Sequence, residues 1–556
     1  MRTQARSRTL EATALHEAVP PDHWCVTRPD LKYLRREVQQ GIWEGSIYPP
    51  EDGSDDFDSH HGPSIYTVNE QHIKPVTHLA GKMSWALMRN PQGLDCDIFI
   101  SHAWQEGIFE FISKVLHSWP RPARHAWCCM LANPQNLDIG ALLQSPKRSP
   151  FALALQEASY VLVVPNRHGS VYTRLWCAYE AYVASEAGKV IIIAKASSRH
   201  QLRRALCYVS AAGFLGMLAG MLAHFWPPAV DLDPVFLSVG IAAAGCSSSM
   251  QSDRLRVALN CIGEMACGYL LVNWSTMQSW LPLHCMPPSV PFVVQRFVWL
   301  VGAALFCLME VDRINSRATR RAAAQLLEGY EDQGSVEFAE CSRDADAVRI
   351  RAEIGDKFGE VDYAIHVLLN AGISTPALRD IARAGVNIDS AAHPDITIPF
   401  LFLLPLNALT LLEMVLDVLF LRSEWYYAAI QGLSFLARAM LLILLCRCPE
   451  DERCFILKMI TKTVAFLLVV VCPSIVLAEL GAGPLPGWIL RAWFSLPIAS
   501  FLALLGLASL GLRTIAALPG GLCLLQLFLA RGCRALQGLC WRNASETSGS
   551  ESSEGS

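Results

Sequence analysis

Long apolar runs in the region after residue 206 constrain the fold of this 556-residue chain more than any other feature. A helix needs roughly 20 mainly apolar residues to cross a ~30 Å hydrocarbon core. The runs that clearly reach this length are residues 207–226, 289–308, 396–420, 426–446, 461–480 and 492–512. Residues 235–250 and 257–272 are marginal. Composition agrees with a partly embedded chain, since 17% of the residues are charged against ~25% in soluble domains.

Basic residues fall on alternate loops between these runs. Arg203 and Arg204 precede the first run, Arg254 and Arg256 follow the second, and Arg317 follows the fourth. Cytoplasmic loops are enriched in Lys and Arg. Because the basic residues fall on every second loop only when both marginal runs are counted as spans, the sequence predicts about eight spans. We therefore expect an integral multi-pass membrane protein whose N-terminal domain and C-terminal tail are cytoplasmic, in a membrane that the sequence does not identify.

The runs divide the chain into segments. We expect membrane helices 1–4 in residues 207–310, a cytoplasmic helical insert in 311–395, and membrane helices 5–8 in 396–512. Residues 513–556 read as an interfacial segment followed by a disordered, Ser-rich tail. Residues 1–90 are polar and mixed, and we expect a loosely ordered lead-in there. Its acidic stretch, EDGSDDFDSHH at residues 51–61, is interpreted as a solvated loop, and no metal site is predicted.

Charge and cysteine usage exclude two other classes of protein. The net charge is -4, from 46 basic and 50 acidic residues, so the chain lacks the basic excess of a nucleic-acid-binding protein. The 19 cysteines are scattered singly through apolar runs, a pattern that favours free thiols over a disulfide framework. We expect a lipid bilayer as a partner, and no nucleic acid.

Short apolar strands alternate with amphipathic helices between residues 95 and 205. Strands are predicted at residues 96–101, 125–132, 159–165 and 189–194, and helices at 107–119, 149–158 and 174–188. Ser149 and Pro150 form an N-cap and N1 pair, and Gly188 ends the last helix. This alternation is typical of a parallel sheet wound by crossover helices, and it predicts a flavodoxin-like α/β domain.

Two motifs in this segment resemble the Toll/interleukin receptor homology (TIR) domain family. The first predicted strand ends in D-x-F-I-S, at residues 97–101, and the third predicted helix carries W-C-x-x-E as Trp176, Cys177 and Glu180. A glycine after the second strand, Gly140, is also usual in the family. The resemblance covers about 100 of the 556 residues. It implies a TIR-like fold for residues 95–205.

The resemblance implies one of two activities. Some family members hydrolyse NAD at the nicotinamide ribosyl bond with the glutamate of this motif, here Glu180; others recruit partners by TIR–TIR association or self-association. A carboxylate suits the first activity because it stabilises an oxocarbenium-like transition state. NAD would then be a substrate, with no cofactor bound permanently. The alternative for Glu180 is a solvated helix residue.

Residues near the two motifs are candidates for binding the dinucleotide. They are Ser101, His102, Trp104, Trp176 and Cys177. Trp104 could stack on a nucleobase or nicotinamide, or simply pack at the strand end. The chain departs from the enzymatic pattern because His102-Ala-Trp-Gln-Glu106 follows the first strand, where basic residues often reach the phosphates. Lys147 or Arg148 could supply that charge.

Ionisable residues within the predicted spans suggest a rival function. Glu413 and Asp417 are four residues apart and share one helix face, and Arg438 lies at a comparable depth on the next span. Burial of charge in hydrocarbon is costly, so such groups often line an ion or proton path, although a structural ion pair would also explain them. The alternative function is a channel or transporter with a regulatory TIR-like domain.

Overall fold

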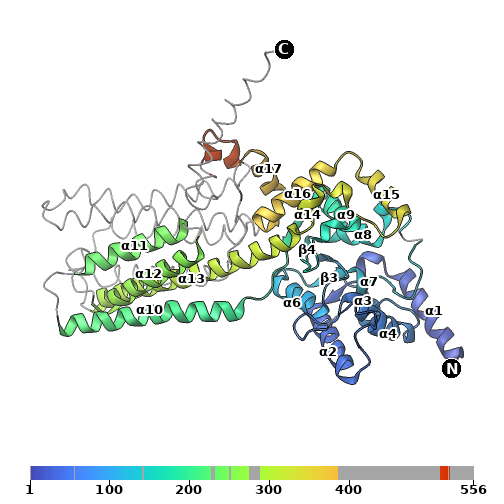
Figure 1. The fold of residues 1–556 in the computed structure, drawn as a ribbon, viewed down its shortest axis with the longest axis horizontal. Helices are drawn as coiled ribbons and strands as arrows, with labels where there is room; N and C mark the ends of the chain where they lie inside the picture. The colour runs from blue at the N-terminus through green and yellow to red at the C-terminus, as the bar shows by residue number, and fades with distance from the viewer. Residues whose placement is uncertain are drawn as a thin grey trace, which may run out of the picture. The chain divides into compact units, whose positions relative to one another are not determined.

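The computed structural model shows two compact units (Figure 1), the first comprising Met1–Ser197 and Ala318–Asp380, the second Ser198–Arg317 and Ile381–Ser556. The structure describes residues 2–55, 57–140, 143–226, 232–249, 252–273, 289–385, 388, 514–523 and 525. The predicted spans at 396–420, 426–446, 461–480 and 492–512 lie outside these residues, as do Glu413, Asp417 and Arg438.

A six-stranded sheet forms the centre of the first unit, with the strand order β1-β3-β2-β4-β5-β6. Its strands are β1 Val26–Thr27, β2 Ile98–Ser101, β3 His125–Cys128, β4 Tyr160–Val163, β5 Val190–Ile193 and β6 Ile373–Ser374. β2 pairs in parallel with β3 and β4, and β4 with β5. All four lie within predicted strands, but the strand predicted at residues 125–132 ends at Cys128, and Cys129–Ala132 forms the short helix α7. These strands are almost continuously apolar because helices cover both faces of the sheet.

The expectation of a parallel-sheet, flavodoxin-like domain is nevertheless wrong, because the sheet is mixed. β1 pairs antiparallel with β3, and β6 pairs antiparallel with β5. Both edge strands are two residues long and come from outside residues 95–205. A two-residue strand shows no alternation of apolar and polar residues, so the sequence carries no signal for it.

The first unit is mostly helical around this sheet. Its longer helices are α1 Arg2–Ala18, α2 Arg28–Glu44, α6 Ile108–Ser118, α8 Pro150–Glu157, α9 Leu175–Glu186, α15 Asp344–Ile354 and α16 Phe358–Ala371. Its shorter ones are α3 Ile65–Val68, α4 Lys74–Leu79, α5 Trp85–Arg89, α7 Cys129–Ala132, α14 Tyr330–Gln333 and α17 Pro376–Arg383. In Figure 1, α8, α9, α15 and α16 lie on one side of the strands, and α2 and α6 on the other.

Helix α8 begins as its sequence predicts. The Ser149 hydroxyl accepts a hydrogen bond from the Ala152 amide at 3.3 Å, and Pro150 occupies the first turn, where no amide hydrogen is needed.

Residues 1–90 differ from the expected loosely ordered lead-in, because much of this region is part of the core. α2 begins with a capping box in which Thr27 and Asp30 each bond the other's backbone amide. Leu31, Leu34 and Val38 are fully buried in the same cluster as the strands. Their spacing places them on one helix face, but the basic residues between them make the segment polar on average.

Residues 318–380 also belong to the first unit, in place of a separate insert spanning 311–395. α15 and α16 pack against α9. β6 then pairs with β5, so that Ile373 lies opposite Ile192 and Ser374 opposite Ile191. The insert was predicted as helical because its apolar residues recur at helical spacing; that spacing does not reveal which partner the helices cover.

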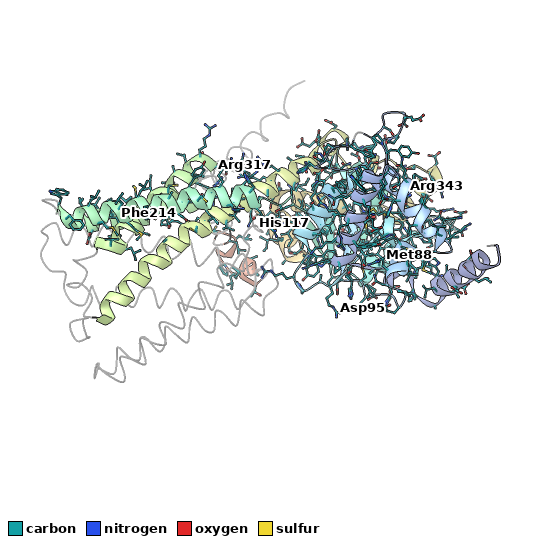
Figure 2. The ribbon with its side chains drawn as sticks, turned by 90° about the horizontal axis from the view of Figure 1, so that it is seen from below. Met88, Asp95, His117, Phe214, Arg317 and Arg343 are labelled. Carbon is teal, nitrogen blue, oxygen red and sulfur yellow. The ribbon has the colours of Figure 1, made fainter. Side chains whose placement is uncertain are left out.

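The described part of the second unit contains α10 Arg199–Phe225, α11 Asp233–Ser249, α12 Asp253–Asn273 and most of α13 Ser289–Leu327. Within the described residues two segments, Arg199–Ala223 and Asp253–Val272, are long and apolar enough to cross a membrane, with mean hydropathies of 1.8 and 1.4. Phe214 of α10, labelled in Figure 2, is 67% exposed. This length and composition indicate association with a membrane.

The expectation of about eight spans is therefore wrong: the described residues provide two candidates. Apolar runs were counted by length, but length does not separate helices that face lipid from helices that pack on other helices. α11 has 17 residues, short of the roughly 20 that a crossing needs. Half of the apolar window in α12 is buried against protein.

Candidate functional site

The candidate site lies at the carboxyl ends of the parallel strands. β2 ends at Ser101, β3 ends at Cys128 and β4 leads into Pro165. The chain passes from β2 to β3 on one side and then to β4 on the other, so its order reverses at β2. Open α/β sheets bind ligands in the crevice at such a reversal, outside the carboxyl ends of the strands. Here α9 brings Cys177 and Glu180 to the end of β2.

Glu180 is buried, with 6% of its surface exposed, which excludes the interpretation as a solvated helix residue. Its Oε2 atom forms no hydrogen bond within the part of the chain that the structure describes. Burial raises the pKa of Glu180 to about 8, although the Ser101 hydroxyl and the Arg174 guanidinium act to lower it. Ser101 is near Glu180 but outside hydrogen-bond geometry, and its buried hydroxyl is also unpaired among the described residues. A buried carboxyl group with one oxygen that lacks a partner is costly and marks a candidate ligand site.

His102 is buried directly after β2. Its Nδ1 atom lies 3.3 Å from the Ile100 carbonyl oxygen, and its Nε2 atom lies 3.6 Å from the Cys129 Sγ atom. Burial lowers the pKa of His102 to about 4, so the imidazole is neutral at pH 7. It therefore offers no positive charge to a phosphate.

Cys177 is buried beside His102, and its thiol donates to the His102 carbonyl oxygen at 3.8 Å. Burial raises the pKa of Cys177 far above its ordinary value and that of Cys129 to about 12. Both thiols are therefore protonated at pH 7, and neither is a ready nucleophile, because the thiolate is the reactive form.

Trp104 is half-buried beside Cys129. Its indole Nε1–H donates to the Cys129 Sγ atom at 3.3 Å, and its ring centroid lies 5.4 Å from that of Tyr66. It packs at the strand end, as one of the two interpretations expected, and its partner Tyr66 comes from the segment between β1 and β2.

Trp176 is separate from the others. Its ring stacks on Phe151 of α8 at a centroid distance of 5.2 Å and meets the edge of Tyr179. Lys147 is also directed elsewhere, since its Nζ atom pairs with Glu353 Oε1 of α15 at 2.5 Å. Trp176 was predicted to bind the dinucleotide with Glu180, but its ring packs against Phe151 of α8 and Tyr179 of α9.

Arg174 is a further candidate site residue, and the motifs in the sequence did not indicate it. It immediately precedes α9, its charge acts on Glu180, Cys129 and Cys177, and its buried Nη1 atom has no hydrogen-bond partner among the described residues. A guanidinium is always charged and suits phosphate oxygens. Arg174 thus supplies a cation that the loop after β2 lacks. The sequence feature that could have indicated Arg174 is its position two residues before Trp176 of the W-C-x-x-E motif.

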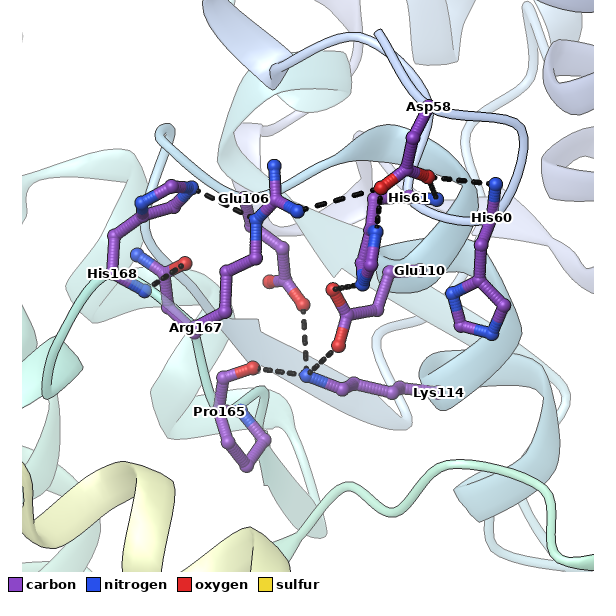
Figure 3. A network of polar contacts seen from close by, with 10 residues as sticks. Asp58, His60, His61, Glu106, Glu110, Lys114, Pro165, Arg167 and His168 are labelled. Atoms are coloured by element: carbon purple, nitrogen blue, oxygen red, sulfur yellow. Dashed lines mark hydrogen bonds and ion pairs between the residues drawn. The ribbon is translucent and has the colours of Figure 1, made fainter. Parts of the chain in front are cut away.

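A second polar cluster lies at the ends of β2 and β4 (Figure 3). The Lys114 Nζ atom of α6 is 2.9 Å from Glu110 Oε1 and 3.4 Å from Glu106 Oε1, and it donates to the Pro165 carbonyl oxygen. Glu106 is fully buried, and burial raises its pKa to about 8 while Lys114 opposes the shift. One ammonium thus faces two carboxylates away from water.

The segment expected to be a solvated loop reaches this cluster. His61 Nε2 is 3.6 Å from Glu110 Oε2, and its Nδ1 atom pairs with Asp58. Arg167 Nη1 in turn lies 3.6 Å from Asp58 Oδ2. Among the described residues no group of three or more His, Cys, Asp and Glu side chains has the arrangement of a metal site.

Comparison of the chain with models of protein families, with curated proteins and with solved structures finds no match. The site itself combines a buried carboxyl group, a guanidinium with an unpaired nitrogen among the described residues, and a half-buried indole.

Proposed function

We propose that this is a membrane-associated signalling protein whose first unit binds NAD at the carboxyl ends of β2 and β3 and hydrolyses its nicotinamide ribosyl bond. The observation that carries the proposal is the juxtaposition of Glu180 and Arg174, each with a buried polar atom that lacks a partner among the described residues. NAD supplies the matching groups, because its ribose hydroxyls donate hydrogen bonds to a carboxylate and its phosphates accept them from a guanidinium.

The reaction needs few groups from the protein. The bond between the ribose anomeric carbon and the nicotinamide nitrogen breaks, and the bonding electrons leave with nicotinamide, which becomes neutral. Positive charge develops on the ribose, and the ionised form of Glu180 stabilises it. Because burial raises the pKa of Glu180 to about 8, this form is a minority at pH 7 and its share grows as the pH rises toward 8. A water oxygen then bonds to the anomeric carbon and loses a proton to Glu180 or to solvent. Arg174 holds the phosphates, and Trp104 is placed to stack on a ring of the dinucleotide.

Two observations support the membrane part of the proposal. α10 and α12 contain segments that are long and apolar enough to cross a bilayer, and Arg199, Arg203 and Arg204 stand at the start of α10. Basic residues favour the cytoplasmic end of a span. We place the first unit in the cytoplasm, where NAD is available.

The test is nicotinamide release by the full-length protein, purified in detergent and incubated with NAD. Glu180→Gln keeps the shape of the side chain and removes its charge, so we expect activity to fall by at least ~100-fold, the usual loss when one stabilising group is removed. Glu157→Gln, at an exposed position on α8, is the matched control and should retain activity.

Two outcomes contradict the proposal in different ways. A wild-type protein that is folded and releases no nicotinamide argues for a domain that recruits partners by self-association. Activity that survives Glu180→Gln removes Glu180 from the reaction.

A further inference from the structure

Residues 58–66 run across the loop that follows β2 and cover the start of α6. The Pro63 carbonyl accepts a hydrogen bond from the Ile108 amide at 2.8 Å, and the His61 carbonyl accepts one from the Phe109 amide at 2.9 Å. The first amides of a helix have no partner within the helix. The Pro63 and His61 carbonyls therefore accept hydrogen bonds from the first amides of α6, which would otherwise be free to bind a loop or an anion.

The same residues pair with the loop itself. The Ile65 amide donates to the Glu106 carbonyl at 3.0 Å, and the Tyr66 amide donates to the Trp104 carbonyl at 3.3 Å. Ser64 and Gly107 form an antiparallel bridge between the two segments. The contact is close: a Cβ atom on Gly107 would lie 2.4 Å from the His61 carbonyl oxygen. Glycine at 107 is thus required for these residues to lie where they do.

Ion pairs hold the start of this segment at Asp58 and His61. At its end, the Tyr66 ring packs on Trp104 of the candidate site. His61 bridges Asp58 and Glu110, Lys114 neutralises Glu110 from below, and Arg167 holds Asp58 (Figure 3). Tyr66 packs on Trp104, whose indole in turn covers the Cys129 thiol.

We propose that residues 58–66 are a strap that closes the candidate site, latched by the ion pairs of His61 and Asp58, and that the strap must lift before a ligand reaches Trp104, Arg174 and Glu180. The strap places the Tyr66 ring on Trp104, whose indole hydrogen-bonds Cys129, and Cys129 in turn contacts the buried His102. The identity of the ligand rests on the proposed function; the strap itself rests on the contacts above.

The test uses full-length protein and two variants that open the strap by different means. Gly107→Ala expels the His61 carbonyl by steric overlap, and Asp58→Asn removes the charge that pairs with His61 and Arg167. Gly359→Ala on α16 is the matched control, because a Cβ atom there meets nothing within 4 Å. The readouts are amide hydrogen exchange in residues 58–66 and 108–110, and the alkylation rate of Cys129, each followed by peptide mass spectrometry.

We expect both variants to exchange and to alkylate about tenfold faster than wild type and the control, which is the effect of losing one hydrogen bond to a charged group. Unchanged exchange in folded variants, or faster exchange with unchanged Cys129 alkylation, would overturn the strap. Asp58→Asn changes an exposed side chain and should fold. The strap can therefore still be tested with this variant if Gly107→Ala does not fold.

Nicotinamide release, measured on the same samples, separates the two proposals. If the strap opens in the variants and they also cleave NAD faster than wild type, the result supports both the strap and NAD hydrolysis. Variants that open while every sample is inactive support the strap and overturn NAD hydrolysis.

Discussion

At Glu180, burial and neighbouring charge act on the same carboxyl group in opposite directions, and burial is the stronger. The pKa rises to about 8 even though Arg174 is close. Glu106 reaches the same value beside Lys114 for the same reason. The pKa of His102 shifts in the opposite direction, to about 4, because burial disfavours its charged form. Around pH 7 His102 is therefore neutral, and Glu180 and Glu106 are largely protonated.

This balance predicts how the stability of the first unit depends on pH. Between pH 4.5 and 8 an unfolded Glu180 is ionised while the folded one holds a proton, so the folded state binds more protons. Stability must then fall as pH rises through this window, by at most ~1.4 kcal/mol per pH unit for each such group. Glu180→Gln cannot ionise, and we expect it to flatten the dependence, as measured by thermal unfolding of full-length protein from pH 5 to 8.

The control for this measurement is Glu157→Gln, which lies at an exposed position and should leave the pH dependence as in wild type. Glu106→Gln should flatten it in the same manner as Glu180→Gln, and the double variant further. A Glu180→Gln protein with the full wild-type slope would show that the carboxyl group is solvated.

Among the elements, α10 and α12 have an unusually close contact through small residues. A Cβ atom on Gly216 would lie 2.0 Å from the Met265 carbonyl oxygen, and one on Gly268 would lie 2.1 Å from the Gly213 carbonyl oxygen. Backbones can approach this closely only where side chains are absent, and in a membrane such packing replaces the hydrophobic effect as the source of helix association. Both helices contain candidate spans, so this seam fits a membrane setting.

We predict that Gly216→Leu disrupts this seam. Its side chain would meet backbone, which cannot move aside as a flexible side chain can, and overpacking of this kind costs roughly 1–3 kcal/mol. Ala219→Leu, at an exposed position on the same helix, is the matched control. The measurement is thermal unfolding in detergent, and equal melting temperatures for the two variants would show that α10 and α12 do not pack through Gly216.

For the whole molecule, the order of segments in the chain matters as much as their structures. The sheet takes β1 from residues 26–27 and β6 from residues 373–374, and α10, α11 and α12 of the second unit lie between β5 and β6 in the sequence. The core of the first unit also includes Leu31, Leu34 and Ile365. Residues 95–205 thus contain the four parallel strands and only part of the core that covers them.

We therefore predict that a fragment of residues 95–205 does not fold as a stable monomer. It would expose both sheet edges and the faces of α6 and α9 that α2 and α16 cover, and exposed edges promote aggregation. Full-length protein in detergent is the reference. A soluble, monomeric fragment with a cooperative thermal transition would show that the outer elements are dispensable.

Membrane association gives the second prediction at this scale. Because α10 and α12 provide candidate spans, we expect the expressed protein to stay in the membrane pellet after alkaline carbonate extraction and to enter solution only with detergent. A peripheral protein of the same host membrane is the control, and release of the full-length chain by carbonate would show that neither helix crosses the bilayer.

The sequence by itself determined the local elements. Apolar runs, with the helix signals at Ser149 and Gly188, were enough to place β2, β4, β5 and the helices α6, α8 and α9, because caps and periodicity act over neighbouring residues. The run at residues 125–132 did not reveal that β3 ends at Cys128 and α7 begins. Only the tertiary structure decided what those elements meet. Contacts between residues far apart in the chain form the two edge strands and direct the Trp176 ring toward α8. Such contacts also bury Glu180 beside Arg174. Burial in particular is set by what covers a side chain, and a local pattern does not contain that information.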